Sequence, residues 1–178
     1  MNIILFGYKG CGKTTYGKQL AKRLGIPFVD TDALACELFE STQGRKLAPK
    51  AIYQHLGESG FRSLERDVIA SLQNLKQSVI AVGGGLMIQR DLGLEMEKLG
   101  ICVFLDVEKE LLKERVLSGE LPAYLDPMNP EQSFEKMYEM RRPLYDGLNS
   151  KAVEIDTGTT DSEVLDTLEE IYVVASNE

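Results

Sequence analysis

The chain has 178 residues, 43% hydrophobic and 27% charged, with a formal net charge of −8 at pH 7. This length suffices for one globular core, so we expect a single domain over residues 1–178. The acidic balance argues against a general nucleic-acid surface, which needs clustered lysine and arginine. No apolar run approaches a membrane span, no secretory signal is visible and the three cysteines show no metal or redox spacing, so a cytoplasmic protein without a membrane partner is expected.

The stretch Gly7–Thr15 fits the phosphate-binding pattern G-x-x-x-x-G-K-[ST] without a mismatch. An apolar run at residues 2–6 precedes it, and apolar residues at helical spacing follow it, which is the strand, loop and helix context of a P-loop. Glycines let backbone N–H groups curl around phosphate oxygens, and the positive end of the following helix adds attraction. The pattern predicts that Lys13 reaches the β- and γ-phosphates and that Thr14 offers a hydroxyl to Mg²⁺.

The next strand, residues 28–30, ends in Asp30-Thr31-Asp32. The carboxyl ends of parallel strands are where α/β proteins bind ligands, so both carboxylates could face the P-loop. The alternative is that one of them only caps the helix that begins near Ala33. We favour a functional role, because two carboxylates stand together at this strand end.

Residues 33–74 are predicted to be helical, with breaks at Gly44, around Pro49 and at Gly57 and Gly60. The last helix of this segment carries core-spaced apolar residues, namely Phe61, Leu64, Val68, Leu72 and Leu75. Its other face carries Arg62, Glu65, Arg66 and Asp67, which are typical of a solvated surface with i, i+3 and i, i+4 ion pairs. For Arg62 the sequence pattern alone leaves a surface role and a ligand contact equally open.

A buried strand at residues 78–82 ends in Gly83-Gly84-Gly85. Three consecutive glycines are costly in chain entropy, which indicates either backbone close to a ligand or residues with positive φ. A helix at 90–98, a strand at 101–106 and a helix at 108–117 follow. Asp106 ends its strand as a Walker B aspartate does and is a rival to Asp30 near Mg²⁺, unless it caps the next helix.

Residues 118–129 show little periodicity and are predicted to form a loop of the kind that often acts as a lid. A helix should begin at Pro130, with Asn129 as its N-cap and Gln132 at the reciprocal capping position. A last strand is expected at 152–156, and a closing helix should start at a capping box from Thr160 to Glu163. Strands alternating with helices five times predict an α/β fold with a parallel sheet covered on both faces.

Taken together, these motifs resemble the shikimate kinase family of P-loop kinases over nearly the whole chain. The motifs are Gly7-x-x-x-x-Gly12-Lys13-Thr14-Thr15, Asp30-Thr31-Asp32, Phe61-Arg62-Ser63-Leu64-Glu65, Gly83-Gly84-Gly85 and Arg141-Arg142-Pro143-Leu144-Tyr145. The resemblance implies a P-loop NTPase fold with a five-stranded parallel sheet in the order 2-3-1-4-5, a substrate-binding helical region at about 31–75 and a lid at about 116–130. It implies ATP- and Mg²⁺-dependent phosphorylation of the 3-hydroxyl of shikimate, in chorismate and aromatic amino-acid biosynthesis. We expect a monomer.

The resemblance also implies roles for individual residues. Lys13 and Asp32 would be catalytic, with Asp32 orienting the attacking hydroxyl first and accepting its proton second. Thr14 and, through water, Asp30 would hold Mg²⁺, which leaves Asp106 as a look-alike. The implied ATP contacts are Gly7, Gly10, Cys11, Gly12, Lys13, Thr14, Thr15 and Arg115. The implied shikimate contacts are Asp32, Arg62, Gly83, Gly84, Gly85 and Arg141, with the two arginines on the carboxylate.

One departure from the family pattern concerns the lid. The family usually has an arginine directly before a proline there, whereas this chain has Leu121-Pro122-Ala123-Tyr124-Leu125. Our hypothesis is that Lys9 or Arg115 partly supplies the missing charge. Two alternatives stay open: a related small-molecule kinase acting on gluconate or a nucleotide, and a nucleotide-binding regulatory protein with weak transfer activity.

Overall fold

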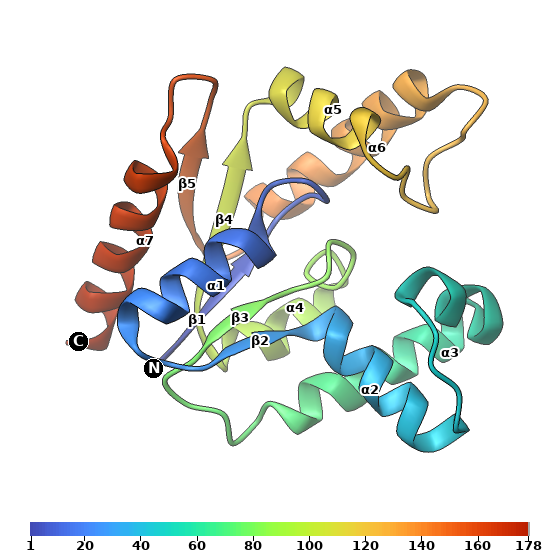
Figure 1. Cartoon of the computed structure of the whole chain (residues 1–178), viewed down its shortest axis with the longest axis horizontal. Coiled ribbons are helices and arrows are strands. Elements are labelled where there is room, and N and C mark those ends of the chain that lie inside the picture. The colour runs from blue at the N-terminus through green and yellow to red at the C-terminus, as the bar shows by residue number, and fades with distance from the viewer. Residues whose placement is uncertain (178) are drawn as a thin grey trace.

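Five parallel strands form one sheet in the computed structural model, which describes residues 1–177. The strands are β1 (Asn2–Phe6), β2 (Phe28–Asp30), β3 (Val79–Ala81), β4 (Gly100–Val107) and β5 (Lys151–Ile155). Their order is β2-β3-β1-β4-β5 (Figure 1), and all four pairings are parallel. The predicted order and the P-loop NTPase class are therefore confirmed.

Seven helices connect or flank these strands. They are α1 (Lys13–Leu24), α2 (Thr31–Gln43), α3 (Pro49–Ser71), α4 (Arg90–Glu97), α5 (Lys109–Ser118), α6 (Pro130–Asp146) and α7 (Asp161–Ser176). Helices α1 and α7 cover one face of the sheet, α4 lies behind it, and α2 and α3 form a separate pair beyond the β2 edge (Figure 1). None of these helices is both long and apolar enough to cross a membrane, as far as residues 1–177 are concerned.

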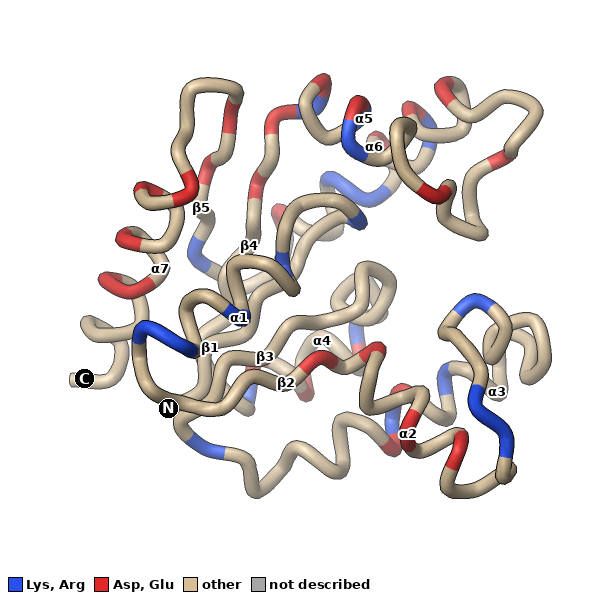
Figure 2. Tube along the Cα trace, in the orientation of Figure 1, with Lys and Arg blue, Asp and Glu red and all other residues tan. Residues whose placement is uncertain are grey.

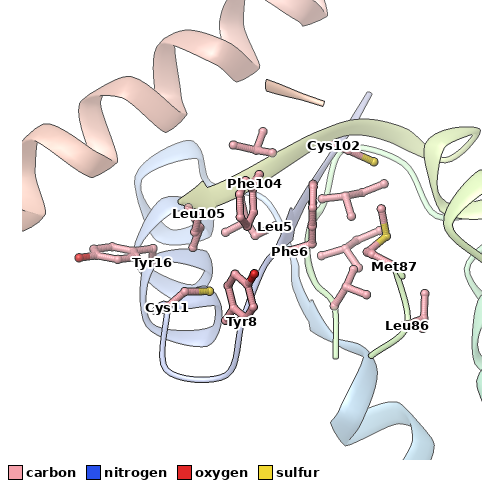
Figure 3. Close-up of a cluster of buried hydrophobic side chains, with 14 of the residues drawn as sticks. Leu5, Phe6, Tyr8, Cys11, Tyr16, Leu86, Met87, Cys102, Phe104 and Leu105 are labelled. Atoms are coloured by element: carbon pink, nitrogen blue, oxygen red, sulfur yellow. The ribbon is translucent and has the colours of Figure 1, made fainter. Parts of the chain in front are cut away.

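The core of the protein lies on both faces of β1, all five residues of which are buried. Leu5 faces α1, since a Cβ built on Gly17 would lie 3.5 Å from its side chain. The neighbouring Phe6 points to the opposite face, as strand geometry requires, and stacks on Phe104 with 5.3 Å between ring centroids (Figure 3). Both faces are thus apolar, as expected for a parallel strand between two helical layers.

The segment between β2 and β3 follows the predicted helical pattern with one exception. Gly44 ends α2 in the left-handed region at φ 65°, and Gly57 kinks α3 at φ 68°. A break at Gly60 is wrong, because α3 continues through it. A glycine in a helix only lowers helix propensity by about 1 kcal/mol, and packing of the apolar face overrides this.

The two predicted caps of the later helices have different outcomes. The capping box from Thr160 to Glu163 is confirmed at the start of α7. Asn129 does precede Pro130 at the start of α6, but its side chain makes no capping bond. Its amide instead donates to Asp126 Oδ2 at 3.2 Å, so the predicted reciprocal cap with Gln132 is wrong. A nearby carboxylate competes successfully for the same side chain.

Candidate active site

The P-loop lies between β1 and α1, and three of its glycines adopt positive φ values. Gly7, Gly10 and Gly12 have φ of 140°, 86° and 97°. A Cβ on Gly12 would also stand 2.6 Å from the Tyr16 ring, and one on Gly7 would stand 3.0 Å from the carbonyl oxygen of Leu105. Glycine is therefore required here both for backbone conformation and for space.

Lys13 begins α1 and folds its ammonium group back over the loop. Its Nζ donates to the carbonyl oxygens of Gly7 at 3.0 Å and Tyr8 at 2.8 Å. Cys11 lies beneath the loop with a fully buried side chain, and its N–H donates to the Tyr8 carbonyl at 3.3 Å. The loop thus presents a positive charge at a helix N-terminus, an arrangement that suits a phosphate group.

Asp30 caps α2 and also contacts the P-loop. Its Oδ1 accepts from the backbone N–H groups of Asp32 and Ala33, so it caps α2. Its Oδ2 accepts from the Thr14 hydroxyl at 2.9 Å, which ties the end of β2 to the P-loop. A hydroxyl and a carboxylate at one point offer the hard oxygen donors that Mg²⁺ prefers.

Asp32 faces Gly83 across the carboxyl ends of neighbouring strands. A Cβ on Gly83 would collide with Asp32 Oδ1, and the Gly83 N–H donates to the Thr31 hydroxyl at 2.9 Å. Glycine at position 83 therefore leaves room for the carboxylate. Desolvation by surrounding residues, followed by the neighbouring charge of Asp30, raises the pKa of Asp32 above its ordinary value, while the charge of Lys13 opposes that shift. A carboxylate with a raised pKa is a stronger proton acceptor.

Arg62 lies on α3 and belongs to a polar network that extends to the backbone of Gly85. Its Nη1 pairs with Glu65 Oε2 at 2.6 Å, and Glu65 is 8% exposed. The amide of Gln89 donates to that same carboxylate oxygen at 3.0 Å and to the Gly85 carbonyl at 3.2 Å. The predicted i, i+3 spacing of Arg62 and Glu65 is confirmed, but the solvated environment predicted for Glu65 is wrong. Gln89, which comes from another segment, was not predicted.

Arg141 lies on α6 under the loop that joins α5 to α6. Its Nη1 is buried, and no hydrogen-bond partner for it exists among residues 1–177. The guanidinium carbon stands 4.3 Å from the centre of the Tyr124 ring. On the next helical turn the Tyr145 hydroxyl donates to the Gly84 carbonyl at 2.6 Å, which joins α6 to the triple glycine. A buried cationic donor without a partner is costly, so this position suits an anion.

A cleft of about 590 Å³ brings these groups together. Its lining comes from the P-loop, the first turn of α2, the triple glycine, the start of α3 and the loop before α6. The lining residues are Lys9, Gly10, Gly12, Lys13, Thr14, Thr15, Asp32, Ala48, Pro49, Lys50, Gly84, Gly85, Glu120, Leu121, Pro122, Ala123 and Tyr124. Arg62 and Arg141 stand one layer behind, in contact with Gly85 and Tyr124 respectively.

The cations around the cleft differ from those predicted. Lys9 lines it, and its Nζ donates to the Glu120 carbonyl at 3.2 Å. Arg115 is exposed on α5 near Gly10 and is not part of the lining. Lys50, from the first turn of α3, lines the cleft although no sequence motif marks it. Figure 2 shows basic residues around α1 and the stretch leading into α3, whereas acidic residues recur along α7.

Asp106 pairs with an arginine of α6 and does not cap the next helix. Its two carboxylate oxygens accept from Arg142 Nη1 at 2.6 Å and Nη2 at 2.9 Å. Helix α5 begins after Glu108 and has no side-chain cap, so capping by Asp106 is wrong. Arg142 also contacts Asp146, and these carboxylates raise its pKa. The pair joins the end of β4 to α6, the helix that carries Arg141.

Comparison with known proteins is consistent with this geometry. A profile of the shikimate kinase family matches residues 9–172. The shikimate kinase of Thermodesulfovibrio yellowstonii is 33% identical over 99% of this chain and 97% of that protein. The structure of shikimate kinase from Acinetobacter baumannii in complex with shikimate superposes with a TM-score of 0.78 at 32% identity, covering 99% of this chain and 94% of that one. The enzyme from Aquifex aeolicus gives 0.74 at 30% identity, covering 99% and 98%.

A gluconokinase from Sinorhizobium meliloti superposes with a TM-score of 0.58 at 17% identity, which shows a shared fold and nothing more. The family profile spans most of the chain, whereas the gluconate alternative has only this likeness of fold. The chain therefore belongs to the shikimate kinase family.

Proposed function

We propose that this chain transfers the γ-phosphoryl group of ATP to the 3-hydroxyl of shikimate. The observation that carries the proposal is Arg141, whose buried Nη1 has no partner within the described part of the chain. It packs against Tyr124, which lines the cleft together with the P-loop. A planar guanidinium recognises a carboxylate by charge and geometry together, and shikimate is a small polyol that carries one.

The donor half of the cleft binds ATP. We propose that the N–H groups of the P-loop and the Lys13 ammonium hold the β- and γ-phosphates, with the loop residues named above as contacts. Lys13 would exchange the carbonyls of Gly7 and Tyr8 for phosphate oxygens. Transfer of a phosphoryl group depends mainly on alignment and on neutralising charge at the γ-phosphoryl oxygens, which these groups begin.

The Thr14 and Asp30 pair fits Mg²⁺, because a hydroxyl and a carboxylate oxygen already meet there at 2.9 Å. We propose that Thr14 would hold the ion directly and Asp30 through water. When bound, Mg²⁺ supplies positive charge to the phosphate oxygens. Asp30 keeps its other oxygen on the α2 backbone and therefore stays oriented.

The acceptor half of the cleft positions the hydroxyl group of shikimate. In our proposal Arg62 and Arg141 clamp the shikimate carboxylate, the backbone from Gly83 to Gly85 meets the ring, and Asp32 orients the 3-hydroxyl. The raised pKa of Asp32 favours its second task, which is to accept the hydroxyl proton as the bond to phosphorus forms. The ion pair with Glu65 fixes the orientation of the Arg62 side chain.

The larger divisions of the chain remain predictions. We propose one kinase domain, with a substrate-binding region at about 31–75 and a lid at about 116–130, and a monomeric cytoplasmic protein. The contacts of α2 with α3, and the share of the 119–129 loop in the cleft lining, support the first two divisions. The Lys9 contact with Glu120 supports Lys9, rather than Arg115, as a partial substitute for the lid arginine.

Release of ADP tests the proposal directly. The purified chain is incubated with ATP and Mg²⁺, and with shikimate, gluconate, a nucleoside monophosphate or no acceptor. We expect ADP release above background only when shikimate is the acceptor. A signal with gluconate or the nucleotide instead would identify a related kinase, and ATP binding without acceptor-dependent ADP release would identify a regulatory protein.

A further inference from the structure

Tyr124 belongs to none of the motifs, yet it covers the proposed acceptor arginine. Its ring centre lies 4.3 Å from the guanidinium carbon of Arg141. Tyr124 also lines the cleft. It stands in the loop between α5 and α6, at the stretch where the family usually has its lid arginine. The loop thus presents an aromatic face to the acceptor side.

The loop holds Tyr124 in place through contacts on both sides. Before it, the Glu120 carbonyl accepts from Lys9. After it, Leu125 is 4% exposed, and its N–H closes a turn onto the Pro122 carbonyl at 3.0 Å. The Asp126 N–H then donates to the Ser133 hydroxyl on α6. The position of the ring is therefore set by the folded loop.

Arg141 is fixed at its backbone by other contacts. The neighbouring Arg142 makes a two-point ion pair with Asp106 at the end of β4. Tyr145 donates to the Gly84 carbonyl. These contacts fix α6 at residues close to Arg141 in the helix. The Tyr124 ring packs against the Arg141 guanidinium.

Stacking on an aromatic ring leaves the in-plane donors of a guanidinium free. The ring attracts the cation through its face, while the N–H groups point outward in the plane. The Nη1 atom of Arg141 matches this arrangement, because it is buried and without a partner among residues 1–177. A stacked guanidinium can therefore still bind a carboxylate with two parallel hydrogen bonds.

We propose that Tyr124 is a positioning residue of the acceptor site, which holds the Arg141 guanidinium in the plane needed to clamp the acceptor carboxylate. This inference rests on the proposed function and adds a residue to it. Because the ring belongs to the loop, docking of the loop and binding of the carboxylate stabilise each other. The phenol takes part as a neutral ring, since desolvation raises its pKa above the ordinary value.

Calorimetric titration with shikimate tests the proposal in four proteins. Tyr124→Leu should raise the shikimate Kd by about tenfold, the upper part of the range for an aromatic and cation pair. Tyr124→Phe keeps the ring and should stay within about twofold of wild type. Met128→Ala changes an 84% exposed residue of the same loop and is the matched control, with no expected effect. The Kd for ADP with Mg²⁺ should stay the same throughout.

A double-mutant cycle separates positioning through Arg141 from a general effect on the loop. In an Arg141→Lys background the planar fork is absent, so Tyr124→Leu should change kcat/KM for shikimate by less than about threefold. A full tenfold loss in that background would overturn the proposal, and so would an equal loss in Tyr124→Phe.

The wild-type protein separates the two claims. If it binds and phosphorylates shikimate while Tyr124→Leu behaves like wild type, the proposal for Tyr124 fails alone. If wild type neither binds nor phosphorylates shikimate, the proposed function fails and the proposal for Tyr124 fails with it.

Discussion

The donor and acceptor halves of the cleft acquire their geometry by different routes. The P-loop is one contiguous stretch, shaped by glycines at positive φ and by local bonds from Lys13 to the carbonyls of Gly7 and Tyr8. The acceptor half combines Asp32 from the start of α2, Arg62 from α3 and Arg141 from α6. Asp32 lies against Gly83 and Arg141 against Tyr124, both from other segments. Arg62 pairs with Glu65 on its own helix, and Gln89 from another segment binds that carboxylate. Local chemistry therefore determines the donor half, whereas tertiary packing determines the acceptor half.

This difference predicts how the two halves respond to mutation. Changes in the P-loop should abolish transfer while leaving the fold and the binding of shikimate intact. Changes behind the acceptor half should alter shikimate binding even where the mutated residue never touches the ligand. The following predictions are ordered from the largest expected effect to the smallest.

Lys13→Ala should give the largest loss, a decrease in kcat of about a thousandfold or more, because a charge is removed from the phosphate oxygens. The shikimate Kd should stay within about twofold. Steady-state kinetics and calorimetry measure the two quantities. Lys22→Ala, an exposed position on the same helix, is the control. Substantial turnover by the Lys13 variant would exclude the P-loop assignment.

Arg141→Leu should mainly weaken shikimate binding, by about 2–5 kcal/mol if the charge pair is desolvated, with ATP KM unchanged. Initial rates across both substrates distinguish these parameters. Arg66→Ala removes an exposed arginine that pairs with Asp91, and it should have little effect. A raised ATP KM with an unchanged shikimate KM would show that Arg141 belongs to the donor half and not to the acceptor half.

The pH dependence of kcat/KM for shikimate should report Asp32. The carboxylate must be deprotonated to accept from the hydroxyl, and desolvation raises its pKa above the ordinary value. Activity should therefore fall about tenfold per pH unit below an inflection that lies above pH 3.8. If kcat/KM of Asp32→Asn falls at the same low pH as in the wild type, the titrating group is not Asp32.

The same shift has a consequence for stability. A carboxyl group with a raised pKa in the folded state binds its proton more tightly there than in the unfolded chain. Stability then falls as the pH rises from the unfolded pKa through the folded one. Asp32→Asn should accordingly raise the Tm at pH 7, and the difference should vanish near pH 3. Thermal unfolding at both pH values measures it, and a lower Tm at pH 7 would contradict the sign.

Asp106→Ala should lower the free energy of unfolding by about 1–3 kcal/mol, since it leaves the Arg142 guanidinium without its two-point partner. It should also weaken shikimate binding, because α6 carries Arg141. Urea unfolding and calorimetry together test this link. Loss of stability with unchanged shikimate binding would show that the pair supports the fold alone.

Lys9→Ala should have a small effect, a decrease in kcat of about two- to fivefold, as expected for one exposed charge. Arg115→Ala should change kcat less, because Arg115 does not line the cleft. If both variants keep wild-type turnover, neither residue substitutes for the missing lid arginine.

How far the sequence predicts this structure depends on how local each feature is. The P-loop followed from one contiguous pattern, and the Arg62 and Glu65 pair followed from helical spacing. The strand order was implied by the family resemblance. The burial of Glu65 did not, because Gln89 and Gly85 come from another part of the chain. Asn129 occupies the predicted N-cap position of α6, but it makes no capping bond because its side chain binds Asp126.

Residues without a motif escaped prediction for the same reason. Arg142 follows Asp106 by 36 positions, so the strand end alone suggested a metal ligand or a cap. Lys50 and Tyr124 line the cleft only because α3 and the 119–129 loop fold toward it. No spacing rule relates either residue to the P-loop. These contacts become visible only when the packing of the elements is known.

Identification of the product tests the central claim most directly. The wild-type chain is incubated with ATP, Mg²⁺ and shikimate, and the product is examined by phosphorus NMR with correlation to the ring protons. We predict a single phosphomonoester coupled to the proton at carbon 3, formed together with ADP. Absence of a phosphomonoester, or coupling to the proton of another ring carbon, would contradict the acceptor geometry proposed around Asp32, Arg62 and Arg141.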